Sequence, residues 1–196
     1  MIIYIMPTFT YQSFIITRIT LKFKYRGKVI FLHDTFDQLF IDYCSYFNGN
    51  QDYFECHEVL EELWKEIAPG HKEHALVGLI QVATSLYHWR RNNLRGACKS
   101  MKSAISLLQS EQHSPYVACF NVSQLLTNCE HALDAMNEQQ PFKAFYLDIS
   151  NAALAQLVQV NMERLPKLDE NFIMHKHTLR DRSDVIAARL AKLQAK

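Results

Sequence analysis

The residues best able to do chemistry lie close together in YFECHEVLEELW, residues 53 to 64. His57 and Glu61 are four positions apart, so on a helix they lie one turn apart on the same side. An imidazole and a carboxylate at this spacing can share a proton or hold a metal ion. The segment departs from the HExxH zinc-binding motif because Glu61 replaces the second histidine, so it has low specificity as a metal motif.

A helical period divides the side chains of this segment into distinct faces. Counted at about 100° per residue, one apolar arc contains Tyr53, Cys56, Val59, Leu60, Leu63, Trp64 and Ile67. The opposite, solvated side contains Glu55, Glu58, Glu62, Lys65 and Glu66. His57 and Glu61 fall between these two sides, next to Trp64. We therefore predict that His57 and Glu61 border the hydrophobic core.

A polar stripe runs along the next apolar segment, ALVGLIQVATSLYHW, residues 75 to 89. Gln81 and His88 are seven positions apart and share one stripe, with Thr84 and Ser85 beside it. A helix this apolar is expected at the centre of the fold, where an unpaired buried polar group costs about 1–3 kcal/mol. The sequence thus predicts a polar cluster in which His57 and Glu61 pair with Gln81 and His88.

Three interpretations of this cluster remain open. The first is a hydrogen-bond network that only fixes the packing of two antiparallel helices. The second is a small-molecule pocket, for which the candidate lining residues are Glu58, Trp64, Gln81, Thr84 and His88. The third is a metal site for Zn²⁺ or Fe²⁺ with open coordination positions, and its candidate ligands are His57, Glu61 and His88. For catalysis, the candidates are His57 as a general base and Glu61 as its partner.

Charge is unevenly distributed along the chain, although the net charge is only +1. Residues 51–74 contain seven acids and two lysines, whereas residues 75–110 contain no acid. The basic residues of that second stretch are Arg90, Arg91, Arg95, Lys99 and Lys102. Complementary neighbouring helices explain this pattern more simply than a basic face for nucleic acid does.

Helical periodicity governs the chain from Asp34 onward. Glycine and proline number only 5 each, which favours long helices. Asp34 or Thr35 is expected to cap the first helix, and Asp52 the second. Ser114 followed by Pro115 predicts the start of another helix that extends to about residue 137. We expect an all-α fold, a compact bundle of five to seven helices.

The first 31 residues follow a different pattern. Residues 18–33, RITLKFKYRGKVIFLH, alternate apolar and polar side chains, which is typical of a β-hairpin. We expect a short hairpin or a disordered extension, or a mis-assigned start, with Val29 or Leu32 as the first residue. The expected organisation is this N-terminal extension (1–31), a helical domain (32–165) and a C-terminal tail with a further helix (166–196).

Composition limits the location and the partners. The five cysteines form no CxxC pair, which indicates reduced thiols and a cytoplasmic location. No window approaches the roughly 18 apolar residues of a membrane span. The near-neutral charge gives no global field for membranes or nucleic acid. A homodimer and a small-molecule ligand remain open as partners.

These motifs together resemble the signature of the bacterial and archaeal family called domain of unknown function 309. The pattern combines the segment around His57 with GLIQVATSLYHWRRNNLRGA, and the resemblance extends over residues 43–108. The matching positions are Phe54, Glu55, His57, Glu58, Glu61, Trp64, Gly78, Leu79, Ile80, Gln81, His88, Asn93, Gly96 and Ala97. The resemblance implies an all-α fold and no known activity. It also implies that Glu55 and Glu58 belong to the signature, although the helical phase places both in solvent.

Three functions are compatible with these patterns. The first is an uncharacterised binding or structural helical domain. The alternative is a metal-dependent or general-base hydrolase that uses His57, Glu61 and His88. The second alternative, an accessory protein for nucleic acid, depends on the basic residues of the 75–110 stretch.

Overall fold

The computed structural model describes residues 22–25, 28–31 and 37–179. The chain divides into two units, Met1–Leu32 and His33–Lys196. In the first unit, strand β1 (Lys22–Tyr25) pairs antiparallel with β2 (Lys28–Phe31), so that Lys22 faces Phe31 and Tyr25 faces Lys28. The remainder of the expected N-terminal extension lies outside the described residues, and so does Leu32, one of the two residues proposed as the true start.

The second unit is helical, which confirms the all-α fold. Its helices are α1 (Gln38–Asn48), α2 (Tyr53–Ile67), α3 (Ala75–Arg90), α4 (Leu94–Ser110), α5 (Pro115–Ala118), α6 (Val122–Asn137), α7 (Ala152–Met162) and α8 (Glu170–Leu179). The described residues thus contain eight helices, one more than the upper end of the expected range of five to seven. None of these helices has both the length and the apolar character required to cross a membrane.

Two local features account for the additional helices. The segment expected to be one helix from Pro115 is divided into α5 and α6, because Asn121 caps α6 by accepting a hydrogen bond from the Gln124 amide. Phe120, just before this cap, forms a bridge with Ile149 in the extended segment that follows α6. Helix α8 lies in the C-terminal tail, residues 166–196.

The helix N-termini are fixed by polar side chains. Asp37 caps α1 by accepting a hydrogen bond from the Leu39 amide, so the expected cap at Asp34 or Thr35 is wrong. Asp52 caps α2, as predicted. The imidazole of His74 caps α3, and its Nδ1 accepts the amide proton of Leu76. Asp52 and His74 thus fix the N-termini of α2 and α3, the two helices that contain the residues predicted for the site.

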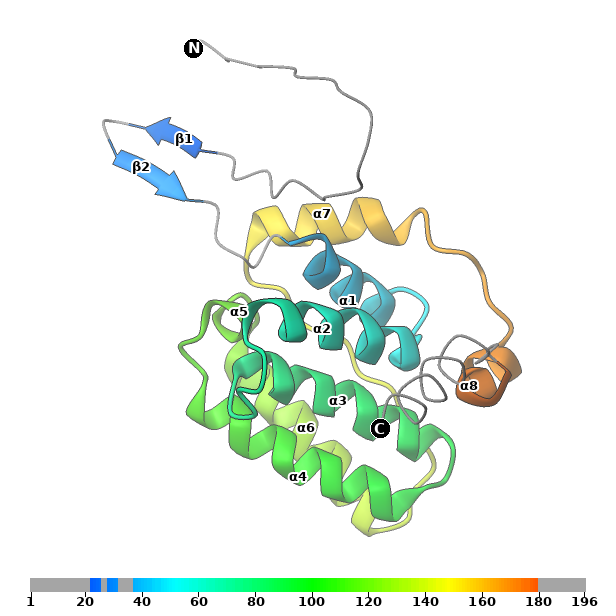
Figure 1. The fold of residues 1–196 in the computed structure, drawn as a ribbon. Helices are drawn as coiled ribbons and strands as arrows, with labels where there is room; N and C mark the ends of the chain where they lie inside the picture. The colour runs from blue at the N-terminus through cyan, green and yellow to red at the C-terminus, as the bar shows by residue number, and fades with distance from the viewer. Residues whose placement is uncertain (1–21, 26–27, 32–36, 180–196) are drawn as a thin grey trace, which may run out of the picture. The chain divides into compact units, whose positions relative to one another are not determined.

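The six longest helices of the second unit follow one another in space in the order α7, α1, α2, α3, α4 and α6 (Figure 1). Helix α3 lies within this row, and eleven of its sixteen residues are buried. Gly78 permits close contact with α4, because a Cβ atom there would lie 3.2 Å from Leu107 Cβ and from Leu108 Cδ2. The prediction that this apolar helix is central to the fold is therefore correct.

Aromatic rings fill the space where α1 meets α2. Phe47 contacts both Tyr43 and Tyr53, at centroid distances of 5.9 and 5.2 Å. Tyr43 also donates its hydroxyl to the carbonyl of Leu79 in α3. These fully buried rings hold the first turn of α2 rigidly against its neighbours. The side chains on the opposite side of α2 therefore project from a fixed base.

Candidate functional site

Helix α2 separates a buried side from an acidic side. Cys56, Leu60 and Leu63 are completely buried between α2 and its neighbours. His57 and Glu61 lie at the edge of this buried side, and 34% of each side chain is exposed. They therefore occupy the half-buried border that the helical phase predicts.

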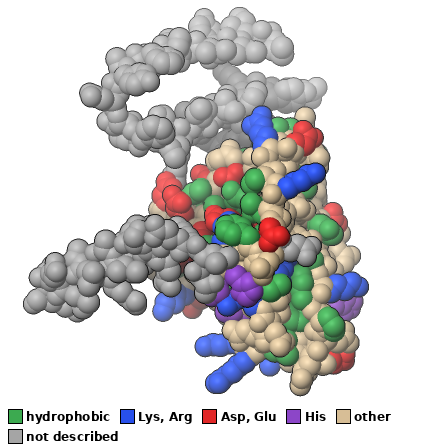
Figure 2. Space-filling model, turned by 90° about the vertical axis from the view of Figure 1, so that its right-hand side faces the viewer, with side chains coloured by type: hydrophobic (Ala, Val, Ile, Leu, Met, Phe, Trp, Pro, Cys, Tyr) green, Lys and Arg blue, Asp and Glu red, His purple; other side chains and the backbone are tan. Residues whose placement is uncertain are grey.

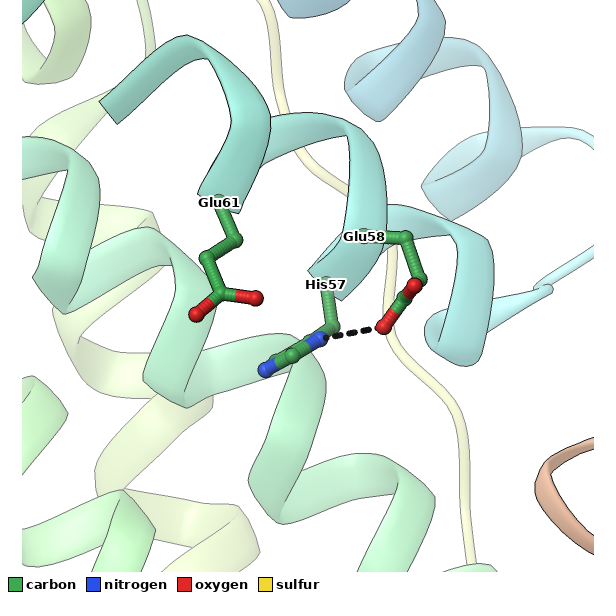
Figure 3. A group of neighbouring side chains, drawn as sticks. All are labelled: His57, Glu58 and Glu61. Carbon is green, nitrogen blue, oxygen red and sulfur yellow. Dashed lines mark hydrogen bonds and ion pairs between the residues drawn. The ribbon is translucent and has the colours of Figure 1, made fainter. Parts of the chain in front are cut away.

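His57, Glu58 and Glu61 form a compact group on one turn of α2 (Figure 3). Nδ1 of His57 lies 3.3 Å from Oε1 of Glu58, while the second ring nitrogen lies on the side of Glu61. One potential ligand atom from each of the three residues lies within 4.8 Å of the others. We call these three residues the His57 triad.

The dimensions of the His57 triad are close to those of a metal site. A divalent transition metal binds nitrogen and oxygen at about 2.0–2.2 Å, so two ligands of one ion lie no more than about 4.4 Å apart. The observed 4.8 Å spacing therefore needs only a small side-chain rotation to enclose an ion. Glu61 also pairs with Lys65, Nζ to Oε2 at 3.2 Å, and an incoming cation would replace that exposed lysine.

A groove of about 600 Å³ lies along the acidic side of α2 and is bounded by α8. This volume is in the range of small-molecule sites. The groove is lined by Glu55, Glu58, Val59, Glu61, Glu62 and Lys65 of α2 and by Phe172 and Lys176 of α8. The lining thus contains four carboxylates and two ammonium groups. The face of the molecule that carries α8 shows acidic side chains beside exposed hydrophobic ones (Figure 2).

Lys176, where α8 bounds the groove, belongs to a buried ion pair. Asp52 is fully buried, and its Oδ2 lies 2.5 Å from Nζ of Lys176. The same ammonium group lies 2.8 Å from Oε1 of Glu55. Burial lowers the pKa of Lys176, but its hydrogen bonds to Asp52 and Glu55 outweigh burial and raise the pKa overall. Lys176 is therefore charged at neutral pH.

The four residues of the predicted polar cluster do not form one network. Among the described residues, no hydrogen bond joins His57 or Glu61 to Gln81 or His88. Nδ1 of His88 lies 3.1 Å from Nδ2 of Asn93, and burial, followed by the charge of Arg91, lowers the pKa of His88. The Oε1 atom of Gln81 is buried without a hydrogen-bond partner in the described part of the chain. His88 is therefore not part of the His57 triad as the described residues form it.

Apart from Gln81, the polar groups of this stripe find partners outside α2, which explains this difference. Thr84 donates to the carbonyl of Ile80 in its own helix, and buried Ser85 donates to the carbonyl of Ala97 in α4. These bonds satisfy the two hydroxyl groups without a partner on α2. The candidate pocket residue Trp64 donates its indole N–H to the carbonyl of His71, and it does not line the groove. Of the predicted pocket residues, only Glu58 lines the groove.

The basic stretch is partly used by the fold. The guanidinium of Arg90 lies 4.6 Å from the Tyr53 ring centroid and donates to the carbonyl of Gln51. That of Arg91 lies 5.3 Å from the Tyr87 ring centroid. Two of the five basic residues therefore help to hold the fold, which reduces the surface available to a phosphate backbone.

Asp52 and Lys176 are absent from the residues that the sequence predicts for the site. Asp52 is identifiable from the sequence only as a helix cap, and nothing in the chain around Lys176 signals its partner. Glu55 and Glu58 have roles that one helical wheel cannot show, because Glu58 pairs with His57 and Glu55 with Lys176. These pairings give a structural role to two signature residues that the helical phase alone places in solvent.

Fold and site together define a small all-α domain with an acidic groove and the adjoining His57 triad on its second helix. The family model described as Domain of unknown function (DUF309) matches residues 40–100. "Uncharacterized protein YpuF" of Bacillus subtilis (strain 168) is 32% identical over 166 residues, covering 81% of this chain and 95% of that protein. The chain belongs to the DUF309 family, as its signature residues indicate. No solved structure matches it.

Proposed function

We propose that this chain is a binding domain whose ligand is a divalent metal ion held by the His57 triad. The observation that carries the proposal is the convergence of one imidazole and two carboxylates within 4.8 Å on a single turn of α2. Imidazole and carboxylate are common ligands of Zn²⁺ and Fe²⁺. The half-buried position leaves coordination sites open to water or to a second ligand in the groove.

The surroundings of the His57 triad favour a cation over an anion. Glu55 and Glu62 also line the groove, so the local field is negative. Because the triad residues belong to one helix, whose buried side is packed between α1 and α3, their backbone positions are fixed before an ion binds. Only the three side chains then lose conformational freedom when they close around the ion.

Titration calorimetry with Zn²⁺ and Mn²⁺ on the wild-type chain and on single variants tests the proposal. We expect one ion per chain, and we expect His57→Ala and Glu61→Gln each to weaken binding at least tenfold, since each removes a direct ligand. Glu62→Gln is the matched control, because it removes the same charge from the same groove without touching the triad. Binding that is absent, or equally strong in all variants, would contradict the proposal.

A second candidate is general-base catalysis by His57. The specific observation that favours it is the 3.3 Å contact between Nδ1 of His57 and Glu58, which orients the ring and leaves Nε2 on the side of Glu61. A carboxylate that orients an imidazole in this way is the arrangement of many hydrolases. Glu58→Gln separates the two candidates. It weakens metal affinity if Glu58 is a ligand, and it lowers only a turnover rate if Glu58 is an orienting group.

A further inference from the structure

The ammonium group of Lys176 occupies a site that the rest of the domain builds. Nζ contacts Oδ2 of Asp52 and Oε1 of Glu55, at 2.5 and 2.8 Å, and it lies 5.8 Å from the Phe172 ring centroid. The exposed fraction of the Lys176 side chain is only 14%. A long lysine side chain is seldom buried to this degree without a specific partner.

The carboxylate that receives this ammonium is fixed without help from α8. Oδ1 of Asp52 accepts the Glu55 amide at 3.1 Å as the cap of α2, which leaves Oδ2 directed at Lys176. Tyr53, the next residue, is locked in the aromatic core. Removing one partner of a buried ion pair leaves an uncompensated charge, which is strongly unfavourable. The paired carboxylates of Asp52 and Glu55 therefore favour a cation at this position.

Three side chains of helix α8 lie close to this site or to α3 in the part of the chain that the structure describes. Ile173 is buried, Lys176 makes the ion pair, and the His177 ring lies 2.9 Å from the Tyr87 hydroxyl. These positions have the i, i+3, i+4 spacing of one helical face. The adjoining residues Asn171 and Phe172 are exposed. Among the described residues, these three side chains thus join α8 to α2 and α3 through one helical face.

The site and its occupant come from different parts of the protein. Asp52 and Glu55 lie inside the segment that the family model matches, residues 40–100, whereas α8 lies outside it. The helices of that segment pack against one another extensively, so the receiving side does not depend on α8 for its shape. An occupant of the same chemistry can therefore come from another molecule.

We propose that Asp52 and Glu55 form a recognition site for a lysine side chain presented by a helical partner segment, and that α8 occupies this site as a built-in competitor. The preferred partner carries an aliphatic residue three positions before its lysine, as Ile173 precedes Lys176. A tethered competitor acts at an effective concentration of order millimolar. A partner must displace α8, so its apparent affinity is reduced by the fraction of time that the site is closed. This proposal is independent of the metal site, because no residue of the His57 triad takes part.

Fluorescence anisotropy with a labelled peptide copy of residues 168–179 tests the proposal on the full-length chain. Ile173→Asp combined with Lys176→Ala releases α8 while leaving Asp52 and Glu55 unchanged. We expect this variant to bind the peptide at least tenfold more tightly than the wild-type chain does. Lys167→Ala, a loss of charge at an exposed position just before α8, is the matched control and should bind like wild type.

Two further arms examine the chemistry of recognition. The same peptide carrying Lys176→Ala should lose at least tenfold in affinity. In the released variant, Asp52→Asn and Glu55→Gln should each weaken peptide binding severalfold. Glu55→Gln keeps this test valid if the Asp52→Asn protein does not fold, because Glu55 is only partly buried. n-Butylammonium should displace the peptide at millimolar concentration, whereas tetramethylammonium, which has no N–H donor, should not. Equal peptide affinity for the released and wild-type chains would overturn the competitor role. Equal affinity of the two peptides would overturn lysine recognition.

Discussion

The individual acids of α2 differ in role because their burial and neighbours differ. Asp52 is fully buried and paired with a lysine, while Glu58 and Glu61 are half-exposed and lie on either side of His57. Glu62 is exposed. The first carboxylate is fixed by the fold, and the next two can reorganise around a ligand. Residue type alone does not separate these cases.

His74 is a single residue that makes stability depend on pH. Burial lowers the pKa of His74 from its ordinary value of 6.5, with Glu111 opposing this effect and His71 adding to it. Below that pH the unfolded chain takes up the proton more readily than the folded chain, so stability falls as pH falls through the lowered pKa. Protonation of Nδ1 also removes the acceptor that caps α3.

His74→Asn tests this prediction, because asparagine is a good cap that does not titrate. Urea unfolding followed by circular dichroism should give a free energy within about 1 kcal/mol of wild type at pH 7.5. The decline between pH 7.5 and pH 5 should be smaller in the variant than in wild type. The same change at exposed His113 serves as the control. An unchanged decline in His74→Asn would show that another group governs the pH dependence.

Among the helices, the close contact of α3 with α4 limits the size of the side chain that α3 can have at position 78. The nearest side-chain atoms of Leu107 and Leu108 leave no room for a branched side chain at Gly78. This close contact keeps α3 and α4 in a fixed register. It also places Ser85 of α3 within 2.7 Å of the Ala97 carbonyl.

Gly78→Val should therefore destabilise the protein. Overpacking of a filled contact costs about 1–3 kcal/mol, and thermal and urea unfolding should both report the loss. Ser103→Val, on the exposed side of α4, is the control and should change stability by no more than about 0.5 kcal/mol. A Gly78→Val variant as stable as wild type would mean that the two helices can move apart freely.

The helical unit as a whole has one shared core, and its thiols report on that core. Four cysteines are buried: Cys44 in α1, Cys56 in α2, Cys119 just after α5 and Cys129 in α6. Burial raises the pKa of the thiols at Cys119 and Cys129 to about 12, and those of Cys44 and Cys56 well above their ordinary values. Cys98 is partly exposed, and its Sγ donates to Asn137.

Thiol titration should therefore show two phases. With Ellman's reagent at pH 8, one thiol should react rapidly in the native chain, and the other four should react only after guanidinium unfolding. Cys98→Ser should abolish the rapid phase and leave the slow one unchanged. Rapid reaction of more than one thiol would contradict a single closed core.

Features that depend on neighbours along the chain follow from the amino-acid order alone. Helical periodicity predicts the all-α fold, the central position of α3 and the half-buried border positions of His57 and Glu61, because the backbone repeat fixes which side chains share a face. The Asp52 cap follows from the same local rules. The family signature likewise depends on short-range spacing.

Contacts between distant residues depend instead on how the helices pack. The lysine that neutralises Asp52 is 124 positions away, and no local pattern encodes a contact at that separation. His88 pairs with Asn93 rather than with α2, because Asn93 lies close by in the turn that joins α3 to α4. The rotation of α2 against α3 and the path of the chain to α8 set these contacts. Both follow from the packing of the whole core, which a single helical wheel does not contain.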